Sequence, residues 1–243
     1  MGMEERTALL LGAQGMEKLA GAHVLLFGLG GVGSYTAEAL ARSGVGALTL
    51  VDDDVVAESN LNRQLVALRS TLGQSKAEVA ARRIADIAPG CRVTPVRLFY
   101  TPETADQLSF AGYDYVIDAV DTVSAKLEII RRAKEAGVPV ISCMGTGNKL
   151  HPEKLEVTWL DKTQGCPLAR VMRRECKARG LGRVRVVYST EPPIRHAGDT
   201  TPQAAGDRPG NAKKSTPGSA AFVPGCAGLM LAAEVVRAIA GAE

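Results

Sequence analysis

The sequence predicts an α/β fold: a Rossmann-like, mainly parallel sheet with helices on both faces, plus a C-terminal extension with additional strands and a mobile loop. Three observations lead to this class. Short apolar runs recur along the chain, as buried parallel strands do. Segments with helical spacing separate these runs, and such alternation gives a sheet covered on both faces. A G-x-G-x-x-G motif lies directly between the first apolar run and the first helix after it.

The first 143 residues supply the alternating elements. A helix is predicted over the first twenty residues, with apolar contacts from Leu9, Leu10, Leu11, Met16 and Leu19. A βαβ unit at residues 23–52 then combines strands at His23–Phe27 and Ala47–Val51 with a helix at Tyr35–Arg42. The elements expected after it are a helix at Ser75–Ile87, a strand at Arg92–Leu98, a short helix at Thr101–Leu108, a strand at Tyr115–Ala119, a helix at Ser124–Ala136 and a strand at Val138–Cys143.

The last hundred residues follow a different pattern. Strands are expected at Lys154–Leu160 and Val184–Tyr188, with a basic helix at Leu168–Arg179 between them. The segment Glu191–Gly218 is rich in Pro, Gly, Thr and charge, which predicts a mobile loop of a length that is usually functional or disordered. An apolar helix of small residues at Ala220–Ile239 is expected to return to the core.

These elements predict a single domain over residues 1–243. We expect its nucleotide-binding part at about residues 20–147 and a substrate-side extension at about residues 148–243. A chain of 243 residues is long enough to bury a sizeable core without disulfides or metals.

Composition narrows the classes of protein. Basic residues number 29 and acidic residues 26, a balance that neither demands nor excludes a nucleic-acid partner. The five cysteines are odd in number and contain no CxxC pair, so we expect free thiols and no zinc. No apolar run approaches a membrane span, and the charged N-terminus does not resemble a signal peptide. We therefore expect a cytoplasmic protein without a membrane span.

The glycine motif consists of Gly28, Gly30 and Gly33, with Gly31 inside it. Its glycines allow a tight turn and let a phosphate approach backbone N–H groups at a helix N-terminus. Asp52 lies 19 residues after Gly33, at the end of the second strand, where a carboxylate can accept hydrogen bonds from ribose hydroxyls. The motif predicts a nucleotide but does not say which one.

Charged and amide side chains after the second and fourth strands separate the candidate nucleotides. They are Asp52, Asp54, Asn60, Asn62, Arg63, Gln64, Lys76, Asp118 and Asp121. An NAD-dependent oxidoreductase needs one acidic residue at the ribose, but it needs no Arg, Lys and extra carboxylates near the pyrophosphate. A nucleotidyl-transfer enzyme uses cations to stabilise charge on phosphates and a carboxylate to hold magnesium. The set therefore favours nucleotidyl transfer.

Several motifs in order resemble one known family. The segments RTALLLGAQGMEKL, GLGGVGS, SNLNRQ and DAVDTVSAK, together with Lys76, resemble the ubiquitin-activating enzyme superfamily in its bacterial ThiF/MoeB/HesA branch. Members of that branch bind ATP and magnesium and adenylate a carboxylate, releasing pyrophosphate.

The resemblance implies a role for each matching residue. Gly30 and its neighbours would cradle the phosphates, and Asp52 or Asp54 would hold the ribose. The residues implied at the phosphates are Asn60, Arg63 and Lys76, and Asp121 is implied as the magnesium ligand. Arg6 matches an arginine that reaches ATP from the neighbouring subunit, which implies a homodimer. The implied catalytic residues are thus Arg6, Arg63, Lys76 and Asp121.

Within this branch, VTWLDKTQGCPLARVMRRECKARG and VRVVYSTEPP resemble segments of the dehydratases that act on threonylcarbamoyladenosine in tRNA. Activators of sulfur-carrier proteins do not share these segments. The resemblance implies adenylation of the threonylcarbamoyl carboxylate, followed by cyclisation with loss of AMP. It also raises a cysteine-desulfurase or sulfur-acceptor protein as a candidate partner.

The basic helix is the candidate contact for tRNA. Arg170, Arg173, Arg174 and Lys177 share one helical face by their spacing. Such a face is either solvated or bound to phosphates, and an enzyme that grips an anticodon stem favours the second reading. Trp159 and Tyr188 are candidates for stacking a base.

Three alternatives stay open. The first is an adenylyltransferase that activates the C-terminus of a ubiquitin-like sulfur carrier. Sulfur-carrier activators often have CxxC zinc sites and a loop cysteine, and the segment Glu191–Gly218 contains no cysteine. Cys226 lies near the start of the last helix, where a small buried residue is the simpler interpretation. The second alternative is an NAD-dependent oxidoreductase, and the third is a binding module without catalysis.

Overall fold

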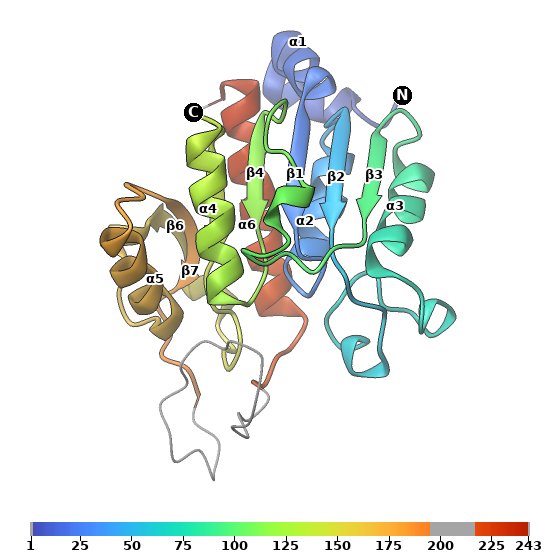
Figure 1. The fold of residues 1–243 in the computed structure, drawn as a ribbon. Coiled ribbons are helices and arrows are strands. Elements are labelled where there is room, and N and C mark those ends of the chain that lie inside the picture. Colours follow the sequence, from blue (N-terminus) through green and yellow to red (C-terminus); the bar gives the residue numbers. More distant parts are fainter. Residues whose placement is uncertain (1, 195–216, 243) are drawn as a thin grey trace.

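A seven-stranded sheet forms the centre of the computed structural model, which describes residues 2–194 and 217–242. The strand order is β3-β2-β1-β4-β5-β7-β6 (Figure 1). The strands are β1 (His23–Phe27), β2 (Ala47–Val51), β3 (Arg92–Val96), β4 (Tyr115–Asp118), β5 (Val140–Cys143), β6 (Leu155–Trp159) and β7 (Arg185–Ser189). All neighbours pair in parallel except β6, which is antiparallel to β7. The expected α/β class with a mainly parallel sheet is confirmed.

Helices cover both faces of this sheet. They are α1 (Glu5–Gly21), α2 (Gly33–Arg42), α3 (Lys76–Ile87), α4 (Val123–Glu135), α5 (Pro167–Ala178) and α6 (Phe222–Ala240). One buried core joins the sheet to α2, α3 and α6, and a second joins it to α4 and α5. Neighbouring residues of one strand enter different cores: Leu26 packs in the first and Leu25 in the second. Because both faces are covered, the strands are continuously apolar in sequence.

The observed elements follow the predicted ones closely, with one clear exception. The helix expected at Thr101–Leu108 is only a 3-10 turn at Ala105–Gln107. The hydroxyl of Thr104 accepts a hydrogen bond from the N–H of Thr101 and donates one to the carbonyl of Phe99. Such local side-chain bonds compete with a helical backbone.

The first helix differs from its prediction in packing. Leu9 and Leu10 were expected to make apolar contacts, but they are 87% and 85% exposed. Gly12 lies inside α1 with φ of +69° and ψ of +170°, which kinks the helix. Leu19, beyond the kink, is fully buried as expected.

The apolar helix α6 has the length and hydropathy of a membrane-spanning segment. It packs against α1 and α2, and its buried residues include Leu231 and Val235. Small residues allow this packing: a side chain on Gly228 would collide with the carbonyl of Val32, which directly precedes α2. Contact with the core therefore accounts for its apolar composition.

The two edges of the sheet carry different parts of the chain. The carboxyl ends of β1, β2 and β4 meet at the lower edge in Figure 1, together with the loop at residues 52–75. Helix α1 lies at the opposite edge. Of the predicted mobile loop at 191–218, residues 195–216 lie outside the described residues. The order 3-2-1-4-5 reverses direction between β1 and β4, and open parallel sheets bind ligands at such a point.

Candidate active site

The glycine loop between β1 and α2 cannot accommodate side chains at two of its positions. Gly28 has a φ of +85°, and a Cβ there would lie 2.8 Å from the carbonyl oxygen of Ala119. A Cβ on Gly33 would overlap the carbonyl oxygen of Gly28. These glycines therefore permit a tight turn that packs directly against the loop after β4.

The middle of the same loop is open. The N–H groups of Gly30 and Gly31 have no hydrogen-bond partner among the described residues. A Cβ on Gly30 would meet nothing closer than the side-chain nitrogen of Gln64, at 3.9 Å. Free N–H groups at the start of α2 and unfilled space above them fit an anionic ligand such as a phosphate.

Asp52 connects the end of β2 to the glycine loop. Its carboxylate accepts one hydrogen bond from the N–H of Leu29 at 2.6 Å and another from the N–H of Asp54 at 2.9 Å. Burial raises the pKa of this carboxyl above its ordinary value, although Lys76 and both N–H groups act in the opposite direction. Of the two aspartates predicted at a ribose, Asp52 is therefore the one that lies against the glycine loop.

Asp54 lies beside Lys76 instead. Lys76 is the first residue of α3, and its ammonium is 2.9 Å from the Asp54 carboxylate. Its side chain is only 5% exposed, whereas that of Asp54 is 60% exposed. The lysine is thus held at a helix N-terminus, where its charge and the helix dipole both favour an anion.

The turn after β2 places Arg63 and Asn60. The Cγ of Arg63 would lie 3.4 Å from a Cβ on Gly31, so this side chain crosses the glycine loop. Its guanidinium donates hydrogen bonds to the carbonyl of Ser59 and the side chain of Asn62, each at 2.9 Å. Asn60 is buried, and its side-chain oxygen accepts the N–H of Ala57 at 3.0 Å. It shapes the turn that presents Arg63.

The sequence analysis placed Gln64 among the polar residues after the second strand but gave it no role in the site. Its side chain is buried next to Gly30, and its amide oxygen has no hydrogen-bond partner among the described residues. A buried acceptor without a partner is rare in native proteins and is expected to receive one from a ligand or water. Its burial beside Gly30 arises from folding, so the sequence pattern alone did not assign it a role.

Asp121 lies on the loop after β4 and is exposed. Its carboxylate accepts a hydrogen bond from the Thr122 hydroxyl at 3.3 Å. Ala119 in the same loop packs against Gly28 of the glycine loop, and Asp121 follows Ala119 by two residues. The structure thus groups the aspartates, Arg63 and Lys76 around one edge of the sheet.

A buried ion pair lies at the start of the loop that carries Asp121. Asp118 ends β4 and Lys126 belongs to α4, and both side chains are fully buried with their charges 3.1 Å apart. Asp118 also accepts hydrogen bonds from the Ser142 hydroxyl and from the N–H of Val120, and Lys126 donates to the carbonyl of Cys143 at 2.6 Å. The pair therefore joins β4, β5 and α4 directly beneath the Asp121 loop.

Replacing Lys126 by methionine is expected to lower the free energy of unfolding by about 3–5 kcal/mol, because it leaves the Asp118 carboxylate buried without its partner. Urea denaturation would measure this loss. The double variant Asp118→Asn, Lys126→Met should lose less than the single variant, since no unpaired charge remains. An equal or larger loss in the double variant would contradict this account.

Arg6 does not join the site within its own chain. It is exposed on α1, at the edge of the sheet opposite the glycine loop (Figure 1). Only a neighbouring subunit could bring an arginine at this position to the nucleotide.

A metal would have few protein ligands at this site. Among residues 2–194 and 217–242, no group of three or more His, Cys, Asp or Glu side chains could hold a metal ion. A single carboxylate such as Asp121 fits magnesium, which keeps several waters and is often bound through one or two carboxylates plus phosphates.

The cysteines are poorly placed for nucleophilic chemistry. Cys143, Cys166 and Cys176 are buried, and burial raises the pKa of Cys143 to about 12 and that of Cys176 to about 11. Burial also raises the pKa of half-buried Cys91. Cys226 packs beside the core that contains α6. A thiol that stays protonated is a weak nucleophile, so Cys91, Cys143 and Cys176 do not favour a thioester route.

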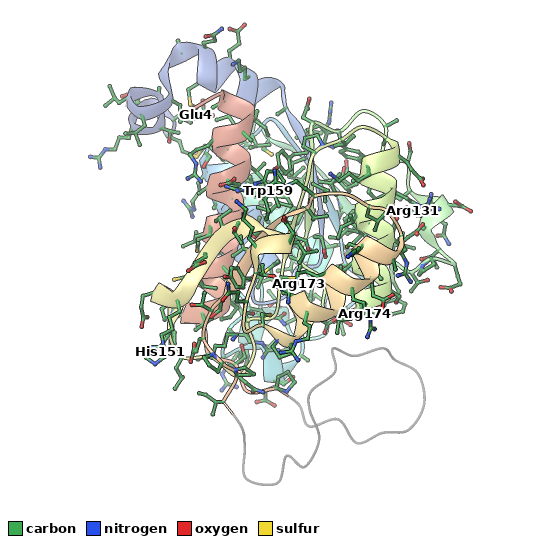
Figure 2. All side chains as sticks on the ribbon, turned by 90° about the vertical axis from the view of Figure 1, so that its left-hand side faces the viewer. Glu4, Arg131, His151, Trp159, Arg173 and Arg174 are labelled. Carbon is green, nitrogen blue, oxygen red and sulfur yellow. The ribbon has the colours of Figure 1, made fainter. Side chains whose placement is uncertain are left out.

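The basic face of α5 contains fewer free cations than its spacing suggests. Arg170, Arg174 and Lys177 are exposed, although Arg174 contacts Glu175 at 2.8 Å. Arg173, labelled with Arg174 in Figure 2, is half-buried. Its guanidinium donates hydrogen bonds to the carbonyl and hydroxyl of Thr163. Arg173 is therefore bound within the chain, and the exposed face consists of the other three.

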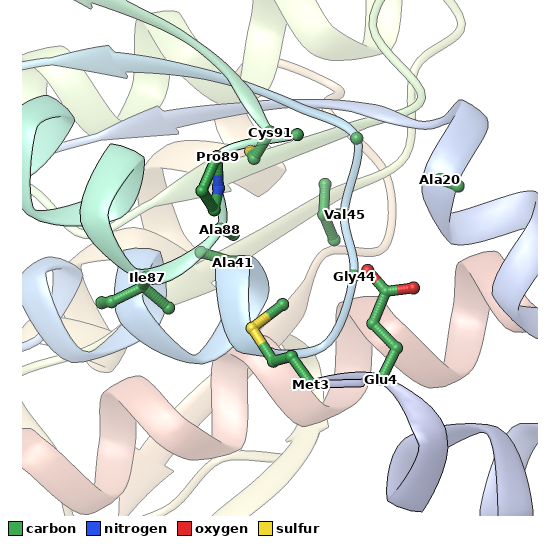
Figure 3. Close-up of a pocket in the computed structure, with 12 residues that line it drawn as sticks. Met3, Glu4, Ala20, Ala41, Gly44, Val45, Ile87, Ala88, Pro89 and Cys91 are labelled. Carbon is green, nitrogen blue, oxygen red and sulfur yellow. The ribbon is translucent and has the colours of Figure 1, made fainter. Parts of the chain in front are cut away.

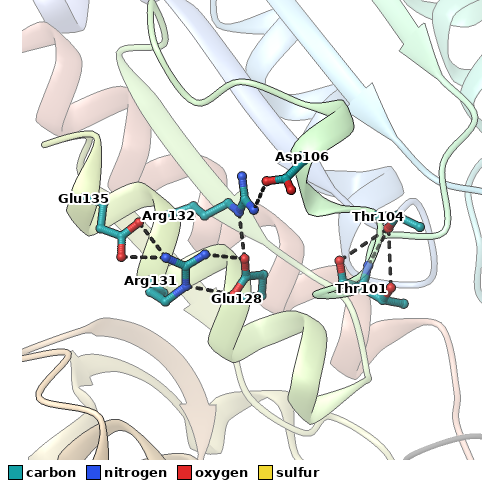
Figure 4. Close-up of polar contacts among 7 residues, drawn as sticks. All are labelled: Thr101, Thr104, Asp106, Glu128, Arg131, Arg132 and Glu135. Carbon is teal, nitrogen blue, oxygen red and sulfur yellow. Dashed lines mark hydrogen bonds and ion pairs between the residues drawn. The ribbon is translucent and has the colours of Figure 1, made fainter.

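The neighbouring arginines on α4 are neutralised. Arg131 contacts Glu128 at 2.5 Å and Glu135 at 2.6 Å, and Arg132 contacts Glu128 at 2.7 Å and Asp106 at 2.5 Å (Figure 4). Pairs of this exposed kind contribute little stability, but they cancel positive charge locally. Of these two helices, α5 therefore presents more exposed positive charge than α4.

Neither aromatic candidate for base stacking is free. Tyr188 is buried, and its hydroxyl donates to Glu156 at 3.1 Å. The Arg183 guanidinium lies 4.2 Å from the centre of the Trp159 ring, and that of Arg185 lies 5.4 Å from it. A cation already occupies the indole face.

A cavity of about 380 Å³ lies at the other edge of the sheet. It is lined by turns before β2 and β3 and by residues near the N-terminus, among them Glu4, Val45 and Cys91 (Figure 3). It is separate from the glycine loop and contains none of the predicted nucleotide residues.

Comparison with known proteins shows which proteins the chain is similar to. The model of the ThiF family matches residues 4–243. The chain is 43% identical over 233 residues to the tRNA threonylcarbamoyladenosine dehydratase of Bacillus subtilis, covering 95% of this chain and 92% of that protein. It resembles the crystal structure of Escherichia coli tRNA N6-threonylcarbamoyladenosine dehydratase in complex with ATP, with a TM-score of 0.85, 36% identity, and coverage of 98% of this chain and 93% of that one.

A second kind of relative matches less of the chain. The molybdopterin-synthase adenylyltransferase of Salmonella typhimurium is 40% identical over 129 residues, covering 53% of this chain and 51% of that protein.

Proposed function

The chain belongs to the ThiF family, and on that premise we propose that it is an ATP-dependent tRNA threonylcarbamoyladenosine dehydratase. The observation that carries the proposal is similarity to such dehydratases over the whole chain, extension included, combined with an open glycine loop beside Asp52, Arg63 and Lys76.

The proposed reaction has two steps. The threonylcarbamoyl carboxylate attacks the α-phosphorus of ATP, which forms an acyl-adenylate and releases pyrophosphate. A nucleophile of the same side chain then attacks the activated carbonyl, closes a ring and expels AMP. One carboxylate oxygen leaves on AMP, so the nucleoside loses one water overall. An internal nucleophile has a high effective molarity, so the second step needs only an activated carbonyl.

Different residues of this chain have different roles in the first step, the adenylation of the carboxylate. The N–H groups of Gly30 and Gly31 donate hydrogen bonds to phosphate oxygens, and the carboxylate of Asp52 accepts hydrogen bonds from the ribose hydroxyls. Arg63 and Lys76 stabilise the negative charge that develops on the phosphates during transfer. Magnesium, held by Asp121, would neutralise further phosphate charge.

The proposed enzyme is a homodimer. Leu9 and Leu10 form an exposed apolar pair on α1, within one turn of Arg6. Apolar side chains this exposed are typical of interfaces, and a second copy that covers them would also receive Arg6 near its nucleotide.

The exposed face of α5 is the proposed tRNA contact. Replacing Arg174 and Lys177 with alanine should weaken tRNA binding and reduce the slope of log affinity against log salt by roughly 2, because two phosphate contacts are lost. Filter binding at several salt concentrations would measure both quantities.

Exposed arginines on the far side of the sheet provide the matched control. The variant Arg92→Ala, Arg97→Ala removes the same charge at β3 and should leave the salt slope unchanged. If both double variants lowered the slope equally, the effect would be one of net charge and not of the α5 face.

One assay tests the function itself. Nucleoside mass spectrometry of threonylcarbamoyladenosine tRNA, incubated with the protein and ATP-magnesium, should show ATP-dependent loss of one water. An unchanged nucleoside, with the protein shown to bind ATP, would instead favour a sulfur-carrier activator, as in the Salmonella relative. Pyrophosphate exchange that requires a carrier with a Gly-Gly tail would then identify that function. A protein that binds tRNA without consuming ATP would be a binding module.

A further inference from the structure

The loop after β5 occupies the next position along the edge that carries the proposed active site. β5 lies beside β4, so residues 144–150 begin next to the loop that holds Asp121. In the order of the sheet, the loops after β2, β1 and β4 supply the proposed ribose, phosphate and metal contacts. A group that attacks the α-phosphorus has to approach from beyond these, and the β5 loop lies on that side.

Lys149 in this loop is an unusual residue for its location. Its side chain is only 4% exposed, yet among residues 2–194 and 217–242 its ammonium donates a hydrogen bond only to the backbone carbonyl of Glu191. It forms no ion pair with any carboxylate of the described residues. Burial lowers the pKa of this lysine, and Glu191 opposes that effect from a longer range.

The nearby carboxylate of Glu191 binds backbone N–H groups and not the ammonium of Lys149. Glu191 is buried, and its side chain accepts hydrogen bonds from the N–H of Leu150 at 3.1 Å and of His151 at 3.0 Å. Although burial opposes it, these N–H groups hold the pKa of Glu191 below its ordinary value. Glu191 therefore fixes the backbone around Lys149 and leaves the ammonium without a direct counter-charge.

The surrounding backbone is held rigidly. Asn148 has a φ of +57°, donates its N–H to the carbonyl of Gly218, and accepts the N–H of Ile194. Residues 145–147, just before it, are partly exposed, which leaves an approach from the surface. A buried ammonium with two unused donors and no carboxylate is costly unless an anion completes it.

We propose that Lys149 binds the carboxylate of the acceptor, the group that is adenylated in the reaction proposed above. This inference rests on the proposed function and extends it to the recognition of the second substrate. Glu191 is a positioning residue, because it fixes the loop and not the ligand. The ammonium holds one carboxylate oxygen while the other faces the phosphate.

A thermodynamic cycle tests this assignment: the affinities of two RNA ligands are measured for the unmodified protein and for a Lys149 variant. The ligands are an anticodon stem-loop with threonylcarbamoyladenosine and the same stem-loop with its carboxylate replaced by a carboxamide. Binding is measured by fluorescence anisotropy with magnesium and a non-hydrolysable ATP analogue. The unmodified protein should prefer the carboxylate on the order of ten- to a hundredfold, as expected for a hydrogen-bonded charge pair.

The variant Lys149→Gln should lose this preference and bind the carboxamide as the unmodified protein does. Lys149→Arg should retain part of the preference, and Lys154→Gln, which removes an exposed lysine nearby, should retain all of it. The carboxamide is the internal control, because a merely structural loss would weaken both ligands equally.

Three outcomes would overturn the assignment: a preference retained by Lys149→Gln, equal weakening of both ligands, or no preference in the unmodified protein. If the unmodified protein dehydrates the tRNA in any of these cases, the proposed function stands and only the role of Lys149 falls. If the unmodified protein does not convert the tRNA, both fall.

Discussion

Replacing Asp121 with alanine is expected to lower ATP-dependent dehydration by roughly a thousandfold while leaving the fold intact. Asp121 is exposed, and within the described part of the chain its side chain makes one weak hydrogen bond, with Thr122, so its removal should cost little stability. It is also the exposed carboxylate closest in sequence to Ala119, which packs against the glycine loop. Without it, the phosphates lose the group proposed to hold magnesium. Nucleoside mass spectrometry and ATP–pyrophosphate exchange would measure the loss.

The matched control is Asp86→Asn, which removes an exposed carboxylate from α3 far from the glycine loop and should leave the rate unchanged. Asp121→Glu should recover part of the activity at raised magnesium concentration, because a carboxylate is restored. Turnover that survives in Asp121→Ala would remove this residue from the mechanism, whatever the fate of the proposed function.

The sequence predicted the parts of the site that depend on local chain geometry. The βαβ pattern predicted both the glycines of the tight turn after the first strand and Asp52 at the end of the second strand. The structure places these residues together. The choice between Asp52 and Asp54 depended on side-chain direction. Because both follow the same strand, only the hydrogen bond to Leu29 and the contact with Lys76 separate them.

Other features depend on contacts between distant segments, which no single-sequence pattern encodes. Lys149 is one of many lysines in the sequence, and in the structure it is buried and bonded to the backbone of Glu191, 42 residues away. Helical spacing predicted Arg173 on the exposed basic face of α5. In the structure its guanidinium is instead hydrogen-bonded to the carbonyl of Thr163. Similarly, Leu9 and Leu10 have the apolar character of a core, while the kink at Gly12 leaves them outside it.

The second large effect concerns Arg6. Arg6→Ala is expected to be as inactive as Asp121→Ala, yet a mixture of the two variants should recover activity. In a mixed dimer, one site combines the intact Asp121 of the first chain with the intact Arg6 of the second. If subunits pair at random, half of the dimers are mixed and each has one complete site of two, so about a quarter of the activity should return. Co-expression with two different tags allows the mixed dimers to be purified and assayed.

The apolar pair on α1 supplies the control for this experiment. Leu9→Glu with Leu10→Glu should abolish dimerisation, seen as a halved mass in light scattering, because it places charge at the proposed interface. Since both side chains are exposed, the monomer should remain folded. Added to both inactive chains, the same changes should prevent recovery. If Arg6 acted within its own chain, the mixture would stay inactive, since no dimer would then contain a complete site. The position of α1 at the opposite edge from the glycine loop argues against that outcome.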